Sequence, residues 1–444
     1  MYNQTEKYKT SKKSRIINLL LITVTIVSIV GMIVDLHHTL VYPGTDLRNR
    51  VVGARLMLKG IDPYFFKWHP GLSAKFYDPF DNPIELLSKL SVPPTVLVLH
   101  SIMAGLSYIQ QKLIWLIVQW SAFIGTILIF IKTSNSRHET KLILIISAFF
   151  ANSLFWRFHI NSGQIYIIYV FLLAIAWFFL KEIAKYNDMI SGFFVGVTSS
   201  LRPSFILFFI PFIFRQKYSF LLGGLLGLLS SISLSYKVAG DLIWEKYILT
   251  MLGMTGLIDL NTYLSPEAKT LPSEDIVYPK IIEGFDSSIR NPLEQHLDNT
   301  SFYDILNALY LPHKRYILVI GFITFLVFVS VFITKYLFPK KPVEHLFLFG
   351  SLICLISDFF IPVGRYSYYD IQMILPLLII INQTETTYLV RSKNNIFLLS
   401  GLLLSTVGFV IVPRALFFSV FLIIFYILIT SSWIFKQTNI PGVF

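Results

Sequence analysis

Long apolar runs alternate with short basic connections along most of this chain. The runs lie at residues 16–34, 113–131, 141–156, 164–180, 189–201, 204–214, 219–236, 316–338, 344–362, 371–382, 396–412 and 414–434. A helix perpendicular to a bilayer needs roughly 20 apolar residues to cross it. The pattern therefore predicts an all-α polytopic membrane protein, a bundle of about 12 transmembrane helices. The runs within 189–214 and 371–382 are short for a crossing, and we expect broken helices there.

The basic connections predict the orientation of the bundle. Lys and Arg gather in residues 1–15 and in the segments "KTSNSRHETK", "RQK", "KYLFPKKP" and "RSKNN". Because basic loops stay in the cytoplasm, both termini are expected there. The first run lacks a small-residue cleavage site, which favours a retained helix over a signal peptide.

One apolar segment does not fit this count. Residues 93–108, "PPTVLVLHSIMAGLSY", are short and begin with a Pro pair. A full crossing there would move every later basic loop outside, so the sequence favours a re-entrant or tilted half-helix, although an odd number of crossings stays open.

Two long polar segments interrupt the apolar runs. The predicted division is a cytoplasmic N-terminus (1–15), an N-terminal transmembrane module (16–236) with an outer loop at 36–92, a large extracytoplasmic loop (237–315) and a C-terminal transmembrane module (316–444). Ordered loops of this size between packed helices are usually functional. We therefore expect a site on the outer face.

The first outer loop opens with a charged helix-compatible stretch, "DLRNRVVGARLMLKGIDPYF", residues 46–65. It begins at Asp46, closes at Gly60 and leads to an Asp-Pro turn. Apolar positions recur at helical spacing beside a largely basic stripe that includes Arg48 and Arg55. This pattern predicts a juxtamembrane helix in the membrane interface, with its cations toward lipid phosphates. On residue type and position alone, Asp46 is more readily a helix N-cap than a catalytic group.

Composition and missing motifs narrow the possible functions. The chain is 55% hydrophobic and carries 37 Lys and Arg against 25 Asp and Glu. In a membrane protein this excess fits anionic headgroups and phosphate-bearing ligands, and no nucleic-acid-binding signature accompanies it. The single Cys354 excludes an intrachain disulfide. The sequence has no metal-binding motif and no ATP-binding loop, so we expect no cofactor and no ATP-driven transport.

Several segments occur in the order of a known family. They are "DLRNRVVGARLMLKGIDPY", "PPTVLVLHSIMAGLSYIQQKLIWLIVQ", "NSGQIYIIYVFLL", "SGFFVGVTSSLRPSFILFFIPFI" and "NTSFYDIL". Together they resemble glycosyltransferase family 87, polyprenyl-phosphate-mannose-dependent mannosyltransferases of the membrane-embedded GT-C superfamily. The family's Lys-Pro is Arg202-Pro203 here. Its late Trp- and His-containing segment is replaced by "IPVGRYSYYD", so the sugar and acceptor are not carried over.

The resemblance implies transfer of mannose, or a related hexose or pentose, from a polyprenyl-phosphate donor. The acceptor would be a hydroxyl of a glycan or glycolipid, and the reaction would invert the anomeric centre. The protein would lie in a bacterial inner membrane, with its site on the extracytoplasmic face. Such chemistry needs a carboxylate base, and the position of Asp46 in the family motif makes it the candidate. Asp35 is the rival, since carboxylates at the membrane edge often mark function, although it could instead cap the first helix.

The remaining candidates would bind the substrates. Guanidinium groups match phosphate in two parallel hydrogen bonds, and the expected donor-phosphate residues are Arg202, Arg365, Arg157 and His159. Snorkelling to the interface is an equal alternative for any one of these arginines. The expected sugar or acceptor residues are Asn161, Gln164, His296, Tyr366, Tyr368, Tyr369 and Asp370. Tyrosines also line membrane interfaces without binding any substrate.

Two other classes of function remain open. An O-antigen ligase or polymerase would also use large outer loops, but would act on a diphosphate-linked glycan with several Arg and a His. A transporter of lipid-linked oligosaccharide predicts inverted repeats and polar residues at the middle of the membrane, whereas the charges here gather outside.

Overall fold

The computed structural model describes residues 2–182, 186–255, 258–260, 278–286, 288–289, 300–312, 314–333, 342–361, 365–384 and 392–437. Within these residues the regular structure is helical apart from one antiparallel pair of two-residue strands, β1 (Ile281–Ile282) and β2 (Phe285–Asp286). The all-α prediction is therefore confirmed for the described part of the chain.

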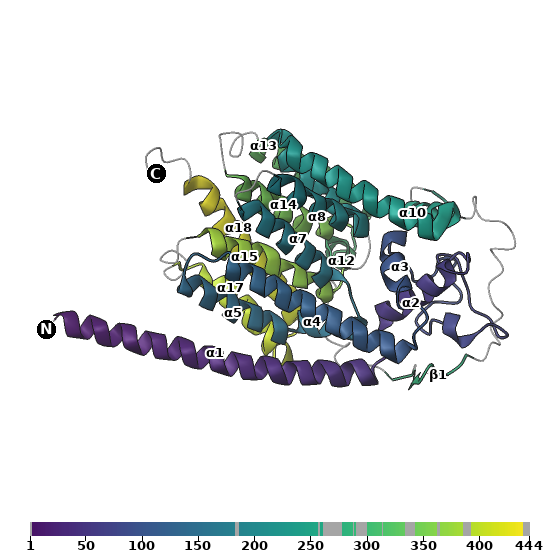
Figure 1. Cartoon of the computed structure of the whole chain (residues 1–444), viewed down its shortest axis with the longest axis horizontal. Helices are drawn as coiled ribbons and strands as arrows, with labels where there is room; N and C mark the ends of the chain where they lie inside the picture. The colour runs from purple at the N-terminus through teal and green to yellow at the C-terminus, as the bar shows by residue number, and fades with distance from the viewer. Residues whose placement is uncertain are drawn as a thin grey trace.

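The first half of the fold carries the longest helices at its two edges (Figure 1). Its helices are α1 (Tyr2–Val41), α2 (Thr45–Met57), η1 (Ala74–Phe76), α3 (Pro94–Ser101), α4 (Tyr108–Lys132), α5 (Arg137–Asn152), α6 (Leu154–Ser162), α7 (Tyr166–Lys181), α8 (Asn187–Leu201), η2 (Pro203–Phe209), α9 (Ile210–Phe214) and α10 (Tyr218–Thr255).

The second half supplies much of the buried centre. Its helices are α12 (Phe302–Ala308), α13 (Lys314–Phe332), α14 (Val343–Ser357), η6 (Asp358–Phe360), η7 (Ser367–Met373), α15 (Ile374–Gln383), α17 (Asn395–Thr406), η8 (Gly408–Val410) and α18 (Ala415–Gln437). Nearly every side chain of α14 and α15 is buried, whereas many apolar side chains of α1 and α13 are exposed. The exposed apolar faces suit contact with lipid tails.

Six helices among the described residues are long and apolar enough to cross a membrane, within Leu21–Val41, Tyr108–Lys132, Tyr218–Met254, Arg315–Phe332, Val343–Phe360 and Ala415–Phe435. The pair α5 and α6, bent by 56°, raises the number to 7 if it forms one broken span. The protein is thus an integral membrane protein. The expected count of about 12 crossings is not confirmed, because several apolar runs form helices shorter than 18 residues.

The expected break in 189–214 falls between α8 and η2. Arg202 has φ −144° and ψ 102° and leaves the helix. Pro203 explains this conformation, because proline disfavours the α region for the residue before it and has no N–H to donate. In the other region where a broken helix was expected, residues 371–382, the end of η7 is followed by the continuous helix α15.

The ends of α3 and α10 can be compared with the boundaries predicted from the sequence. Helix α3 has eight residues, about 12 Å, which is too short to cross a membrane. Its length agrees with a half-helix, and its re-entrant or tilted placement stays a prediction. Helix α10, in contrast, continues past residue 236 to Thr255 across a break at Gly240, where φ is 77° and ψ is 172°. The segment expected to begin the second outer loop therefore starts as a helix.

Small residues bring α8 and α10 into close contact. A Cβ atom at Gly192 would lie 1.9 Å from the carbonyl oxygen of Phe220, and one at Gly196 would lie 2.0 Å from that of Gly224. Only glycine permits the two backbones to approach this closely, as is common between membrane helices. The contact fixes the end of α8, where Arg202 lies.

The polar segment at residues 36–92 occupies one end of the molecule. Figure 1 shows α2, α3 and β1 together at the right, while α1 begins at the far left. Helix α2 packs against α3, and α3 packs against α10. The charged stretch of the sequence therefore sits on a folded layer at one end of the helix bundle.

Candidate functional site

Helix α2 is buried and does not lie exposed in an interface. All its residues from Leu47 to Met57 are buried. Its N-cap is Gly44, in the left-handed region at φ 73°, and the N-cap interpretation of Asp46 is wrong. The Asp46 carboxylate is therefore available for contacts with other elements.

The basic stripe of α2 binds protein oxygens. The Arg48 guanidinium lies 2.5 Å from the Glu283 carboxylate, and Arg55 donates to both Glu283 oxygens at 2.7 and 2.9 Å. Both arginines also donate to backbone carbonyls, among them those of Tyr77 and Leu106. The prediction that this stripe faces lipid phosphates is wrong for Arg48 and Arg55, because both guanidinium groups bond to oxygens inside the protein.

Glu283 lies in the hairpin between β1 and β2. Burial raises the pKa of its carboxyl, but hydrogen bonds and charge from Arg55 and Arg48 outweigh burial and lower it. The side chain thus stays ionised at neutral pH. This ion-pair cluster fastens the hairpin to α2.

Asp46 lies where three parts of the chain meet. Its carboxylate accepts a hydrogen bond from the Gln164 amide, which follows α6. Hydrogen bonds from Tyr368 of η7 and from Asn49 also reach it. Burial raises the pKa of Asp46, and the charge of Arg50 is the strongest opposing influence. A partly buried carboxylate with raised proton affinity has the chemistry of a general base.

Gly163 determines how Gln164 reaches Asp46. Gly163 ends α6 in the left-handed region, at φ 69° and ψ 37°. A Cβ atom there would lie 2.5 Å from the Leu47 Cβ. The Gly163 carbonyl accepts from Arg50 at 2.5 Å and from Trp115 at 2.8 Å. The end of α6 is therefore tied to α2 directly beside the carboxylate.

We expect Gly163→Ala to lower the free energy of unfolding by about 1–2 kcal/mol, the penalty of a left-handed conformation for a non-glycine residue, with a further loss from the Leu47 contact. It should also move Gln164 away from Asp46 and lower activity. Thermal unfolding in detergent would measure the first effect. Gly105→Ala is the matched control, since nothing lies within 4 Å of a Cβ atom there. Equal unfolding temperatures for the two variants would contradict this account.

A tyrosine cluster, defined as Tyr166, Tyr169, Tyr368 and Tyr369, connects Asp46 to two cations. The Tyr166 ring centroid lies 6.1 Å from that of Tyr368 and 4.4 Å from that of Tyr369. The Arg202 guanidinium carbon lies 4.8 Å from the Tyr166 ring and 5.0 Å from the Tyr369 ring. That of Arg365 lies 5.7 Å from the Tyr369 ring. Asp46, Arg202 and Arg365 thus surround one group of rings.

Each of the two cations has a carboxylate partner. Arg202 pairs with Asp358 at 2.8 Å, and its side chain is 12% exposed. Arg365 pairs with Asp370 at 2.7 Å, and these side chains are only 2% and 0% exposed. Arg365 also donates to the Thr300 hydroxyl at 2.6 Å. The geometry favours Arg202 as the cation that a ligand can reach, and a structural role for the enclosed pair of Arg365 and Asp370.

Asp35 is enclosed and fully bonded. It is 0% exposed and pairs with Arg157, which also donates to the Gly31 carbonyl at 2.7 Å. The indole nitrogens of Trp120 and Trp156 donate to Asp35 at 3.1 and 2.9 Å. This arrangement favours a structural role for both Asp35 and Arg157, joining α1 to α4 and α6.

The remaining predicted residues lie apart from Asp46 or at its margin. His159 is 0% exposed and its Nε2 accepts from the Ile167 backbone at 3.2 Å, which links α6 to α7. Asn161 turns toward α1 and contacts His38 at 3.1 Å. Tyr366 is 39% exposed and lies 5.7 Å from Tyr368, ring to ring. His296 lies outside the described residues.

Three groups beside Asp46 were not among the residues predicted for the site. Arg50 is 1% exposed and donates to the Asp46 backbone carbonyl at 2.8 Å. Its spacing of four residues from Asp46 could have revealed it, because such positions are neighbours on a helix. Asn49 lies three residues after Asp46, a spacing that also makes two residues neighbours on a helix. Lys89, whose charge also acts on Asp46, left no local signal because it comes from the far end of the polar segment.

The fold and these contacts describe an integral membrane protein with a carboxylate, a tyrosine cluster and paired cations at one end of its helices. Residues 92–273 match the family model of glycosyltransferase family 87. The match agrees with the resemblance found in the sequence motifs: this segment of the chain is similar to glycosyltransferase family 87. Gln164 and Arg202 lie inside the matched segment and Asp46 precedes it. No curated protein and no solved structure matches the chain.

Proposed function

We propose that this protein transfers a sugar, mannose or a related hexose or pentose, from a polyprenyl-phosphate donor to a hydroxyl of a glycan or glycolipid. Transfer takes place on the extracytoplasmic face of a bacterial inner membrane, with inversion and with Asp46 as the general base. The observation that carries the proposal is the position of Asp46, which joins α2, the end of α6 and η7 and lies next to the tyrosine cluster.

The proposed reaction is a single displacement. The acceptor oxygen attacks the anomeric carbon from the face opposite the phosphate, the bond between that carbon and the phosphate oxygen breaks, and polyprenyl phosphate leaves. The acceptor proton passes to Asp46 as the new bond forms. Inversion follows because attack and departure occur on opposite faces of the sugar.

Arg202 is the proposed contact for the donor phosphate. Negative charge on this group grows as the bond breaks, and a fixed cation in a site with little water stabilises it. The ion pair with Asp358 holds the guanidinium in place, and its 12% exposure leaves it accessible. The neighbouring rings of Tyr166 and Tyr369 supply flat faces against which a sugar can lie.

A donor assay tests this function. The purified protein would be placed in nanodiscs and given membrane glycolipids together with radiolabelled polyprenyl-phosphate hexoses or pentoses, or with the corresponding nucleotide sugars. We expect label to move only from a polyprenyl-phosphate sugar. Transfer from nucleotide sugars alone would contradict the proposal, as would transfer from a diphosphate-linked glycan alone when that donor is added as a third arm.

The pH dependence of the reaction should reflect Asp46. A base must be deprotonated, so kcat/KM falls as the pH falls through its pKa. Because burial raises this pKa, we expect the acid limb above the ordinary carboxyl value of about 4. Lys89 lowers the same pKa, so Lys89→Gln should move the limb to higher pH. Lys59→Gln, another exposed lysine of this segment, is the control. An unchanged limb in Lys89→Gln would contradict the assignment.

A further inference from the structure

A cavity of about 250 Å³ lies beside α2, on the side of the polar segment at residues 63–90. Its volume is just below the roughly 300–1,000 Å³ of small-molecule pockets, a size that suits a compact ligand such as one sugar residue. The segment has its own fixed architecture. Lys67 pairs with Asp81 at 2.8 Å, and Tyr64 donates to the Val92 carbonyl at 2.9 Å.

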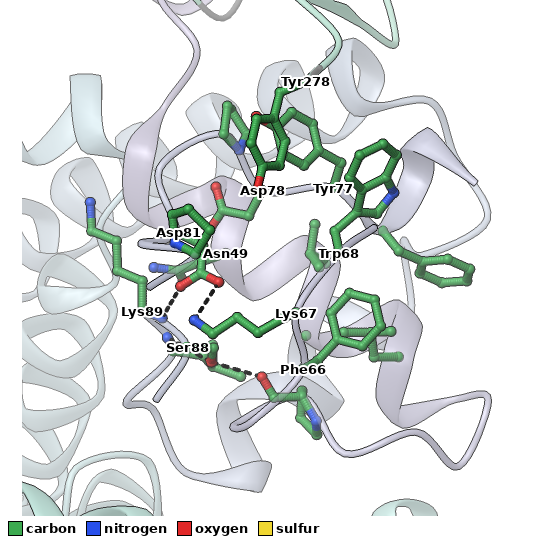
Figure 2. A pocket seen from close by; sticks show the side chains of 18 residues that line it. Asn49, Phe66, Lys67, Trp68, Tyr77, Asp78, Asp81, Ser88, Lys89 and Tyr278 are labelled. Carbon is green, nitrogen blue, oxygen red and sulfur yellow. Dashed lines mark hydrogen bonds and ion pairs between the residues drawn. The ribbon is translucent and has the colours of Figure 1, made fainter. Parts of the chain in front are cut away.

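One wall of this cavity is aromatic. Figure 2 shows the rings of Trp68, Tyr77 and Tyr278 gathered on one side of the pocket. The Trp68 and Tyr77 centroids lie 4.9 Å apart, and Tyr77 and Tyr278 stack at 5.5 Å with 14° between their planes. Aromatic faces carry negative charge and attract the weakly positive C–H groups of a sugar ring. The wall therefore offers a platform for a pyranose.

Polar side chains line the cavity beside these rings, and their charges balance. Asn49, Asp78, Asp81, Lys67 and Lys89 line it (Figure 2). Two carboxylates and two ammonium groups leave no excess of cations, so this cavity is not built to hold a phosphate. Carboxylates and an amide are suitable partners for the hydroxyl groups of an uncharged sugar. In the described part of the chain, no hydrogen bond or ion pair is formed by the Lys89 ammonium, which contacts the Phe80 ring at 5.5 Å.

The cavity adjoins Asp46 through α2. Asn49 lines the cavity and its side chain is hydrogen-bonded to Asp46. Gly53 and Leu56 continue the same wall along the helix. Gln164 and Tyr368 of the tyrosine cluster also reach Asp46. The carboxylate is therefore joined both to the cavity wall and to the proposed donor site, as a base that takes a proton from an acceptor hydroxyl must be.

We propose that this cavity binds the terminal sugar of the acceptor, an uncharged pyranose or furanose ring. The ring stacks on Trp68 and Tyr77, and its hydroxyls contact Asp78 and Asn49, with the reacting hydroxyl toward Asp46. The assignment to the acceptor rests on the proposed transferase function, whereas sugar binding itself does not.

One residue of this site, Tyr278, comes from the second polar segment. It precedes the β1–β2 hairpin, which Glu283 fastens to α2 through Arg48 and Arg55. The stacking of Tyr278 on Tyr77 closes the aromatic wall. The acceptor site is thus made from two segments that are about 200 residues apart in the sequence.

Binding can be measured without any transfer. Saturation-transfer NMR of the full chain in nanodiscs would use the methyl glycosides of glucose, galactose, mannose and arabinose, with glycerol 3-phosphate as a probe for an anionic headgroup. We expect at least one glycoside to bind, Trp68→Ala to weaken it at least about tenfold, and Trp68→Phe to keep most of it, because the platform supplies the affinity. Asp78→Asn should also weaken binding.

Controls separate this inference from the proposed function. Ile84→Ala removes an exposed apolar side chain of the same segment. This variant should bind the glycoside as the wild type does. Absence of glycoside binding in the wild type, binding of glycerol 3-phosphate alone, or unchanged binding in both Trp68→Ala and Asp78→Asn would overturn the inference. Glycoside binding without transfer activity would support the sugar site and remove the transferase function.

Discussion

Replacing Asp46 by Asn is expected to lower the rate of sugar transfer by about 10²–10⁴-fold, the usual contribution of a general base. The amide keeps the shape of the carboxylate but cannot accept the proton of the acceptor hydroxyl. Gln164 donates to this position, and an amide oxygen preserves that hydrogen bond. Unfolding temperature should therefore change little, so that the loss is one of chemistry. Initial rates with a polyprenyl-phosphate sugar would measure it.

Asp62→Asn is the matched control for this experiment. Asp62 lies in the same polar segment, and its carboxylate accepts from the Tyr64 backbone at 2.8 Å, a bond that an amide oxygen can keep. We expect its transfer rate to stay close to that of the wild type. Wild-type activity in Asp46→Asn would remove the base from the proposal, and an equal loss in both variants would show that the segment as a whole is sensitive to its charge.

The largest effect on stability is expected at Asp35. Asp35→Leu leaves the Arg157 cation without its carboxylate, and breaking a buried ion pair typically costs about 3–5 kcal/mol in the free energy of unfolding. Trp120 and Trp156 also lose the acceptor for their indole N–H groups. Thermal or denaturant unfolding in detergent would measure the loss.

The double variant Asp35→Leu with Arg157→Leu distinguishes a structural role from a catalytic one. Replacing both partners of a buried pair by apolar residues is often close to neutral. We expect the double variant to recover much of the lost stability and, with it, transfer activity. Recovered stability without recovered activity would make Asp35 the base instead of Asp46.

The local features of this fold were predictable from local sequence. Pro203 ends α8 at Leu201, directly before Arg202, and the short run at 93–108 contains only the eight-residue helix α3. The number of crossings was harder to obtain, since apolar runs of similar composition form either long helices or short buried ones. Hydropathy measures the affinity of a segment for an apolar surrounding, and the interior of this protein provides one as well as the lipid does.

The partners of the charged residues in the candidate site could not be predicted from the sequence. A stripe that carries Arg48 and Arg55 has the same pattern whether it faces lipid phosphates or Glu283, which lies 235 residues from Arg48. Similarly, the sequence near Asp35 does not indicate that its partner is Arg157, 122 residues away. The charged residues themselves could be recognised from the sequence, but their ion-pair partners could not. A contact between distant segments does not change the local sequence pattern of either one.

The ion pairs of Glu283 also bear on how the protein is assembled. Translation proceeds at about 5–20 residues per second, so α2 emerges on the order of ten seconds or more before the carboxylate that neutralises it. During that interval two guanidinium groups depend on backbone carbonyls and on water. The folding of the layer that contains α2 is therefore completed late in synthesis. Truncation of the nascent chain before the β1–β2 hairpin would leave Arg48 and Arg55 without their ion pairs to Glu283.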